Sequence, residues 1–191
     1  MTTIEVADYL RANIDWPRFA RLTKALDKQL NAGQLRFLKA RLFEKAIEKY
    51  SNGTLQYVDQ VGCDFIMIGF HNIRLEMKYT ADGIYTPAKG ELTKSCKIKL
   101  TNSNGTNTHL TLPAYYADYA MFIGMRSAIL FDKNTLNAHL TSDGDGTYAV
   151  VPPSLGTMIA DKNVMTGDNQ LEADFIKQLD KSLEIYASNI V

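Results

Sequence analysis

The stretch from Gly62 to Tyr79, GCDFIMIGFHNIRLEMKY, constrains the fold of this chain more than any other part of it. It contains an apolar run from Phe65 to Phe70, a break at His71-Asn72 and a second run from Ile73 to Tyr79. Both runs alternate or are rich in residues that suit a pleated strand. The stretch therefore predicts a β-hairpin with a tight connection at the break.

Side chains alternate between the two faces of a strand, so the second run divides into two sets. The apolar set is Ile73, Leu75 and Met77, and the charged set is Arg74, Glu76 and Lys78. Asp64 stands just before the first run. Folding the chain back at the turn therefore brings Asp64 within a few ångströms of Glu76.

Two carboxylates and a lysine at one end of a hairpin form a recognisable chemical set. Carboxylates supply the hard oxygen ligands that Mg²⁺ prefers. Such a metal lowers the pKa of a bound water and stabilises charge on a phosphate, and a nearby lysine can orient the attacking water. The alternative is an amphipathic strand whose charged face is solvated and makes an ordinary cross-strand ion pair.

Asp64 and the element Glu76-Met77-Lys78, which begins 12 positions further along, resemble the motif of the PD-(D/E)XK nuclease superfamily. Within it the chain is most similar to the small type II restriction endonucleases. The proline that precedes the aspartate in this family is replaced here by Cys63. The resemblance covers Asp64 to Lys78 and, by the order of elements, Thr54 to Phe131.

The resemblance implies an endodeoxyribonuclease that uses Mg²⁺ and leaves 5′-phosphates. Its catalytic residues are Asp64, Glu76 and Lys78, and the metal is held by Asp64, Glu76 and the main-chain carbonyl of Met77.

A glutamate from the helix before the core hairpin often joins the metal site in this family. By order along the chain, the candidates for this additional acid are Glu44 and Glu48. The alternative for either glutamate is a solvated partner for Lys45 or Lys49.

The segment from Lys94 to His109, KSCKIKLTNSNGTNTH, predicts a β-ribbon that turns at Asn104-Gly105. Lysines suit phosphates, asparagine can pair with adenine in the major groove, and a β-ribbon can enter a groove. The alternative is a solvent-facing hairpin with an ordinary polar tip. Beside a nuclease-like core we expect DNA contacts from Lys94, Lys97, Lys99, Asn102, Asn104, Asn107 and His109.

Apolar residues at helical spacing predict three helices before the hairpin. These run within Met1–Ile14, from Asp15-Trp16-Pro17 to Leu30, and from about Gln34 to Tyr50. Five cations lie off the apolar stripe of the third helix, and we interpret most of them as a solvated face: Arg36, Lys39, Arg41, Lys45 and Lys49.

The remaining pattern predicts strands at Leu55–Val61, Tyr119–Met125, Ser127–Phe131 and Tyr148–Val151, with a short helix at Asn134–Leu140. Residues 142–146 predict a turn and residues 161–169 a loop, followed by a final helix that reaches Tyr186. The fold class is therefore α/β: a helical N-terminal segment, then a restriction-endonuclease-like mixed central sheet flanked by helices. We expect one domain, residues 1–191.

The charge of the chain is uneven although its formal net charge is zero. Residues 1–110 carry 16 Lys and Arg against 11 Asp and Glu, a balance of +5, and residues 111–191 carry 5 against 10, a balance of −5. A positive cleft in the first part remains compatible with this distribution. The sequence contains no run of 18 apolar residues, so we expect no membrane span, and from the acids of its N-terminal segment we expect no signal peptide.

Two cysteines make neither a disulfide framework nor a zinc site, so we expect reduced thiols and a cytoplasmic location.

The predicted function is a type II restriction endonuclease that cuts a specific short site in double-stranded DNA as a homodimer. One alternative is a repair or junction-resolving nuclease of the same superfamily. The other is a non-catalytic DNA-binding or interaction module, in which the carboxylates and the lysine do not converge.

Overall fold

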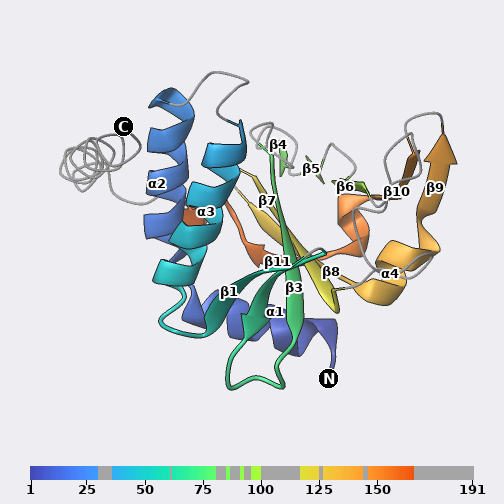
Figure 1. Ribbon diagram of the computed structural model, residues 1–191, viewed down its shortest axis with the longest axis horizontal. Coiled ribbons are helices and arrows are strands. Elements are labelled where there is room, and N and C mark those ends of the chain that lie inside the picture. Colours follow the sequence, from blue (N-terminus) through green and yellow to red (C-terminus); the bar gives the residue numbers. More distant parts are fainter. Residues whose placement is uncertain are drawn as a thin grey trace.

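A computed structural model describes residues 1–29, 36–60, 62–80, 85–86, 91–92, 96–99, 117–124, 127–143 and 146–165 of the chain. It has an α/β fold built on a six-stranded sheet (Figure 1). The strands, in spatial order, are β1 (Leu55–Gln60), β2 (Cys63–Met67), β3 (Arg74–Thr80), β7 (Tyr119–Gly124), β8 (Ala128–Asp132) and β11 (Thr157–Ala160). The sheet is mixed, because β3 runs parallel to β7 while every other neighbouring pair is antiparallel.

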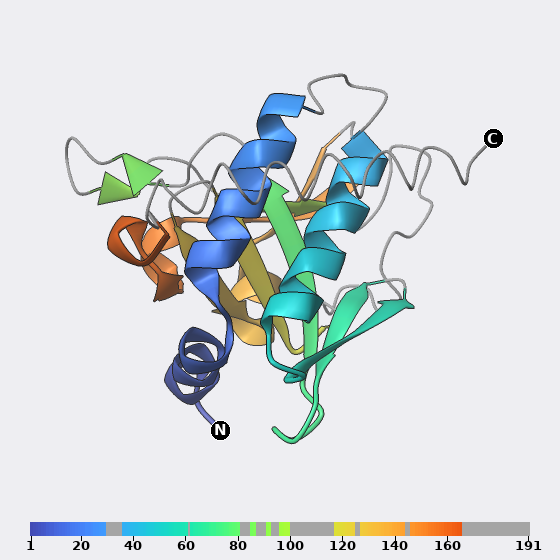
Figure 2. The ribbon, with the colours of Figure 1, turned by 90° about the vertical axis from the view of Figure 1, so that its left-hand side faces the viewer.

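The three predicted N-terminal helices are confirmed as α1 (Thr3–Asn13), α2 (Trp16–Gln29) and α3 (Arg36–Tyr50). A capping box starts α1, in which Thr2 and Glu5 each accept a hydrogen bond from the other's main-chain N–H. Helices α2 and α3 lie side by side over one face of the sheet (Figure 2). None of the described helices is long and apolar enough to cross a membrane.

A first core cluster fills the space between these helices and the sheet. Its largest fully buried side chains include Trp16 and Phe19 of α2, Phe43 of α3 and Phe65 of β2. The ring of Phe43 lies 4.2 Å, between centroids, from that of Tyr79 on β3. The helix pair is thus anchored on the hairpin that carries the candidate site.

The other side of the sheet carries a second, smaller layer (Figure 1). It contains α4 (Lys133–Ala138) and a three-stranded sheet in the order β6 (Cys96–Lys99), β10 (Gly146–Val151), β9 (Leu140–Asp143). A second core cluster, which includes Phe122, Phe131, Leu136 and Val151, packs between the two layers. The short strands β4 (Tyr85–Thr86) and β5 (Glu91–Leu92) pair with each other.

The predicted hairpin is confirmed, but its first strand ends at Met67 and not at Phe70. Gly69, His71 and Asn72 have φ angles of 74°, 56° and 51°, which cannot continue a pleated strand. The main-chain N–H of Met67 donates to the carbonyl of Ile73 (2.9 Å) and closes this longer turn.

The region after the central strands contains more regular structure than predicted. The predicted helix at Asn134–Leu140 ends at Ala138, and Leu140 begins β9. The 3₁₀ turn η2 (Pro153–Leu155) and β11 were not predicted, and α5 (Lys162–Met165) occupies part of the expected loop. Arg11 on α1 donates to the carbonyls of Met158 and Ile159 in β11, a long-range contact that no local pattern reveals.

Arg74 and Asp118 tie the start of β3 to the residue before β7. Three bonds to the Asp118 carboxylate come from the Arg74 main-chain N–H (2.9 Å), Nε (3.0 Å) and Nη2 (2.7 Å). The Asp118 N–H in turn donates to the Arg74 carbonyl (3.0 Å). The hydrogen bonds and charge of Arg74 lower the pKa of Asp118, although burial, the largest single effect, acts to raise it. This double connection fixes the register of the strand that carries Glu76 and Lys78.

We predict that Asp118→Ala lowers the free energy of unfolding by about 1–3 kcal/mol at neutral pH, because charged hydrogen bonds are lost. Because the pKa of Asp118 is lower in the folded state than in the unfolded state, the full stabilisation is present above the unfolded-state pKa of about 4. It is lost as pH falls through the lower folded-state pKa. Urea unfolding of both proteins at neutral pH and at about pH 3 measures the effect; a constant difference across this range would contradict the assignment.

Candidate functional site

The backbone register of the hairpin sets the positions of the two carboxylates. Phe65 pairs with Leu75 and Ile66 with Arg74, so continuing the register by one residue puts Asp64 across from Glu76. Cross-strand partners share one face of a sheet. The Asp64 Oδ2 accepts a hydrogen bond from the main-chain N–H of Met77 (2.6 Å). Asp64 is thereby held against the Glu76-Met77-Lys78 element.

Glu76 is a buried carboxylate, with only 3% of its surface exposed. Its Oε1 accepts a hydrogen bond from the Nζ of Lys78. Its Oε2 is buried and has no hydrogen-bond partner among the described residues. An unsatisfied buried polar atom is costly, and a carboxylate oxygen is costlier still. The site therefore holds one oxygen that a cation, a water or a proton would satisfy.

Lys78 is held as an ammonium ion. Burial is the largest single effect and acts to lower its pKa, but the charges of Glu76 and then Asp64 outweigh it, so the pKa of Lys78 is raised. The glutamate at position 44 adds a smaller effect in the same direction. A lysine of this kind stays charged at neutral pH and suits electrostatic work better than proton abstraction.

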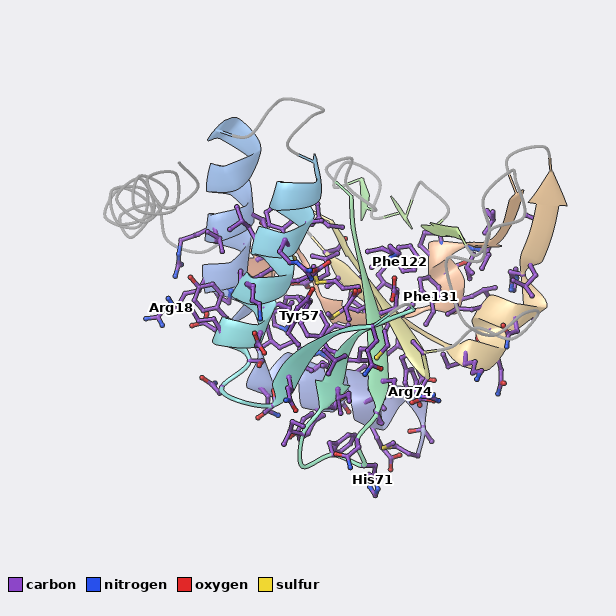
Figure 3. All side chains as sticks on the ribbon, viewed as in Figure 1. Arg18, Tyr57, His71, Arg74, Phe122 and Phe131 are labelled. Carbon is purple, nitrogen blue, oxygen red and sulfur yellow. The ribbon has the colours of Figure 1, made fainter. Side chains whose placement is uncertain are left out.

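The neighbouring strand gives the pair an apolar setting. On β7, Ala120 pairs with Glu76 and Phe122 pairs with Lys78 in parallel register. Phe122 is buried and contacts Phe131 edge to face, with 5.5 Å between ring centroids (Figure 3). Charge interactions at the site are therefore stronger than in open water.

The two glutamates of α3 have different roles. Glu48 accepts a hydrogen bond from the Tyr57 main-chain N–H (2.8 Å) and pairs with Lys45 (3.0 Å), so it ties α3 to β1. Glu44 is mostly buried, with 16% of its side chain exposed, and lies 3.5 Å from Arg41. Because the negative charge of Glu44 also helps to raise the pKa of Lys78, Glu44 is the better candidate for the additional acid.

Cys63, which occupies the position of the family's proline, is buried beside the carboxylates. Burial, together with the charges of Asp64 and Glu76, raises the pKa of its thiol to about 11. The thiol is therefore protonated at neutral pH and is not a nucleophile.

The predicted DNA-contact segment lies mostly outside the described residues, including Lys94, Asn102, Asn104, Asn107 and His109. Lys97 and Lys99 belong to β6, where they pair with Val150 and Tyr148 of β10. The predicted C-terminal helix also lies outside the described residues.

Sequence reasoning did not identify the link between Arg74 and Asp118, because 44 residues separate them. It also missed the cations of α3 that lie over Tyr57.

Among the described residues, no group of three or more His, Cys, Asp or Glu side chains is placed to hold a metal; the site offers the Asp64 and Glu76 pair. Comparison of the chain with protein-family models, curated proteins and solved structures found no match.

Proposed function

We propose that this chain is a Mg²⁺-dependent endodeoxyribonuclease of the type II restriction class, with a restriction-endonuclease-like fold. The observation that carries the proposal is the buried Oε2 of Glu76, which has no partner in the described part of the chain and lies beside Asp64 and the charged Lys78. A carboxylate kept in this state costs stability, and such costs concentrate at functional sites.

The donor set fits Mg²⁺. This ion binds through one or two carboxylates, keeps several waters and takes its remaining ligands from substrate phosphates. Asp64 and Glu76 would hold it, with the main-chain carbonyl of Met77 as a third ligand and Glu44 as the candidate additional acid. When bound, the ion would lower the pKa of a water and stabilise negative charge on the phosphate.

The charged side chain of Lys78 would act on the phosphate and the water during hydrolysis. The Lys78 ammonium would balance the charge of the scissile phosphate and orient the water that attacks phosphorus. A new P–O bond forms, the P–O3′ bond breaks, and the 3′-oxygen leaves with a proton. The products then carry a 5′-phosphate and a 3′-hydroxyl.

The order of elements supports the same proposal. A helix that carries a candidate acid (α3) precedes the hairpin, and further strands complete a mixed sheet after β3. One small site cuts one strand, so cutting a duplex calls for two copies, and a two-fold dimer matches a palindromic target.

Incubation of the native chain with plasmid and phage DNA tests the function. We expect discrete fragments in Mg²⁺ and none when excess EDTA removes the metal. The fragments should religate without prior phosphorylation, because their 5′-phosphates are present. A smear instead of bands would indicate a less specific nuclease of the same superfamily. Failure to cut varied methylated and unmethylated DNAs would favour the non-catalytic binding module.

A further inference from the structure

Two cations of α3 lie over one tyrosine of β1. The Arg41 guanidinium carbon is 4.9 Å from the centroid of the Tyr57 ring, and the Lys45 Nζ is 4.2 Å from it. Stacking of this kind holds the charged groups themselves in place over the ring. Both side chains remain about half exposed, at 46% for Arg41 and 54% for Lys45.

On α3 the acidic side chains are more buried than the basic ones. The helix carries five cations against two acids, in a chain of zero net charge. Its acids turn inward, since Glu44 and Glu48 are 16% and 31% exposed. Its cations at positions 41, 45 and 49 are exposed and recur about every 6 Å along the axis. The outer side of α3 therefore presents a row of positive charge.

This row begins next to the candidate site. Arg41 lies 3.5 Å from Glu44, and Glu44 acts on the charge of Lys78. The register puts Tyr57 on the face of the sheet that carries Phe65, whereas Glu76 and Lys78 alternate to the other face, so the row and the site adjoin at Glu44. A duplex with its scissile phosphate at Lys78 and its backbone running past Glu44 would reach Arg41, one helix turn away on α3.

We propose that Arg41 and Lys45 are positioning residues that hold the DNA phosphates flanking the scissile one. This inference rests on the proposed function for its substrate. An arginine fork suits two phosphate oxygens, and a lysine supplies a mobile point charge. The ion pairs with Glu44 and Glu48 lie within one helix turn, and their cationic ends are about half exposed. Pairs of this kind at a surface are weak, so a phosphate can compete with the glutamates for the two cations.

Binding of a short fluorescent duplex in EDTA, followed by anisotropy across a salt series, tests the inference without cleavage. Arg41→Gln/Lys45→Gln should weaken binding about tenfold. It should also reduce the slope of log affinity against log salt by about 1.8, since each lost phosphate contact removes about 0.9. The charge-preserving variant Arg41→Lys/Lys45→Arg should keep the native slope.

The matched control is Arg18→Gln/Lys24→Gln, which removes two exposed cations from α2. Arg18 projects from the outer side of α2, whereas Tyr57 lies beside α3 (Figure 3). We expect the control to keep the native slope. An equal loss of slope in both variants, or a native slope in the α3 variant, would overturn the inference; circular dichroism and thermal unfolding would confirm that each variant is folded.

Cleavage in Mg²⁺ separates this inference from the proposed function. If both are right, the α3 variant raises KM about tenfold while kcat stays near native, because a positioning contact to the ground state is lost. A native chain that binds DNA but never cuts it would overturn the function, and the salt slope would still decide the inference. A native chain that does not bind the duplex would overturn the inference.

Discussion

Replacing Lys78 with alanine is expected to lower the rate of DNA cleavage by about 10²–10⁴-fold. The ammonium group of Lys78 contacts Glu76 and interacts with the charge of Asp64, and the proposed function assigns it to the scissile phosphate and its attacking water. Removing it takes away a fixed positive charge that favours the transition state. The measurement is the single-turnover rate at saturating DNA, which separates the chemical step from binding.

The control for this experiment is Lys133→Ala, which removes a cation of α4 and leaves the hairpin unchanged. It should cut at the native rate. Because the pKa of Lys78 is raised, its charge persists above neutral pH, and the native rate should not fall between about pH 7 and pH 9. Retention of cleavage by the Lys78→Ala variant would show that this lysine is only a structural partner of Glu76.

Much of the hairpin could be predicted because its physics is local. A side-chain period of two, together with a turn at His71 and Asn72, is enough to put Asp64 across from Glu76. The helices before it follow from apolar residues at helical spacing, as Phe43 and Ile47 show in the core. The prediction that the strand continues to Phe70 was wrong because apolarity alone does not reveal a left-handed backbone at Gly69.

The remaining features depend on contacts between distant parts of the chain. Strand β11 is short, and its carbonyls are bound by Arg11 from the first helix. The choice between Glu44 and Glu48 depends on which face of α3 packs against β1, whereas in the sequence each glutamate stands between an apolar residue and a lysine. Whether the Oε2 of Glu76 finds a partner is likewise a property of packing: it has none among the described residues, and its register partner on β7, Ala120, offers no polar side-chain atom.

The double variant Glu76→Leu/Lys78→Met is expected to abolish cleavage and yet stabilise the fold by about 1 kcal/mol. Replacing a buried ion pair with apolar residues of similar volume is often neutral or stabilising. Here one oxygen of Glu76 has no partner among the described residues. Its removal therefore eliminates the desolvation penalty of a buried oxygen that lacks a hydrogen bond. We place the gain at the low end of the range because 38% of the Lys78 side chain is exposed. Urea unfolding in EDTA measures the change.

The matched control is the other ion pair of the same strand, replaced as Arg74→Met/Asp118→Leu. The Asp118 carboxylate also accepts a hydrogen bond from the Arg74 main-chain N–H (2.9 Å), and this donor loses its acceptor in the double variant, so the variant should lose about 1–3 kcal/mol. Opposite signs for the two double variants would mean that Arg74 and Asp118 serve the fold, whereas Glu76 and Lys78 are kept for chemistry at some expense to stability. Destabilisation of both by a similar amount would contradict a functional role for the Glu76 and Lys78 pair and favour the non-catalytic module.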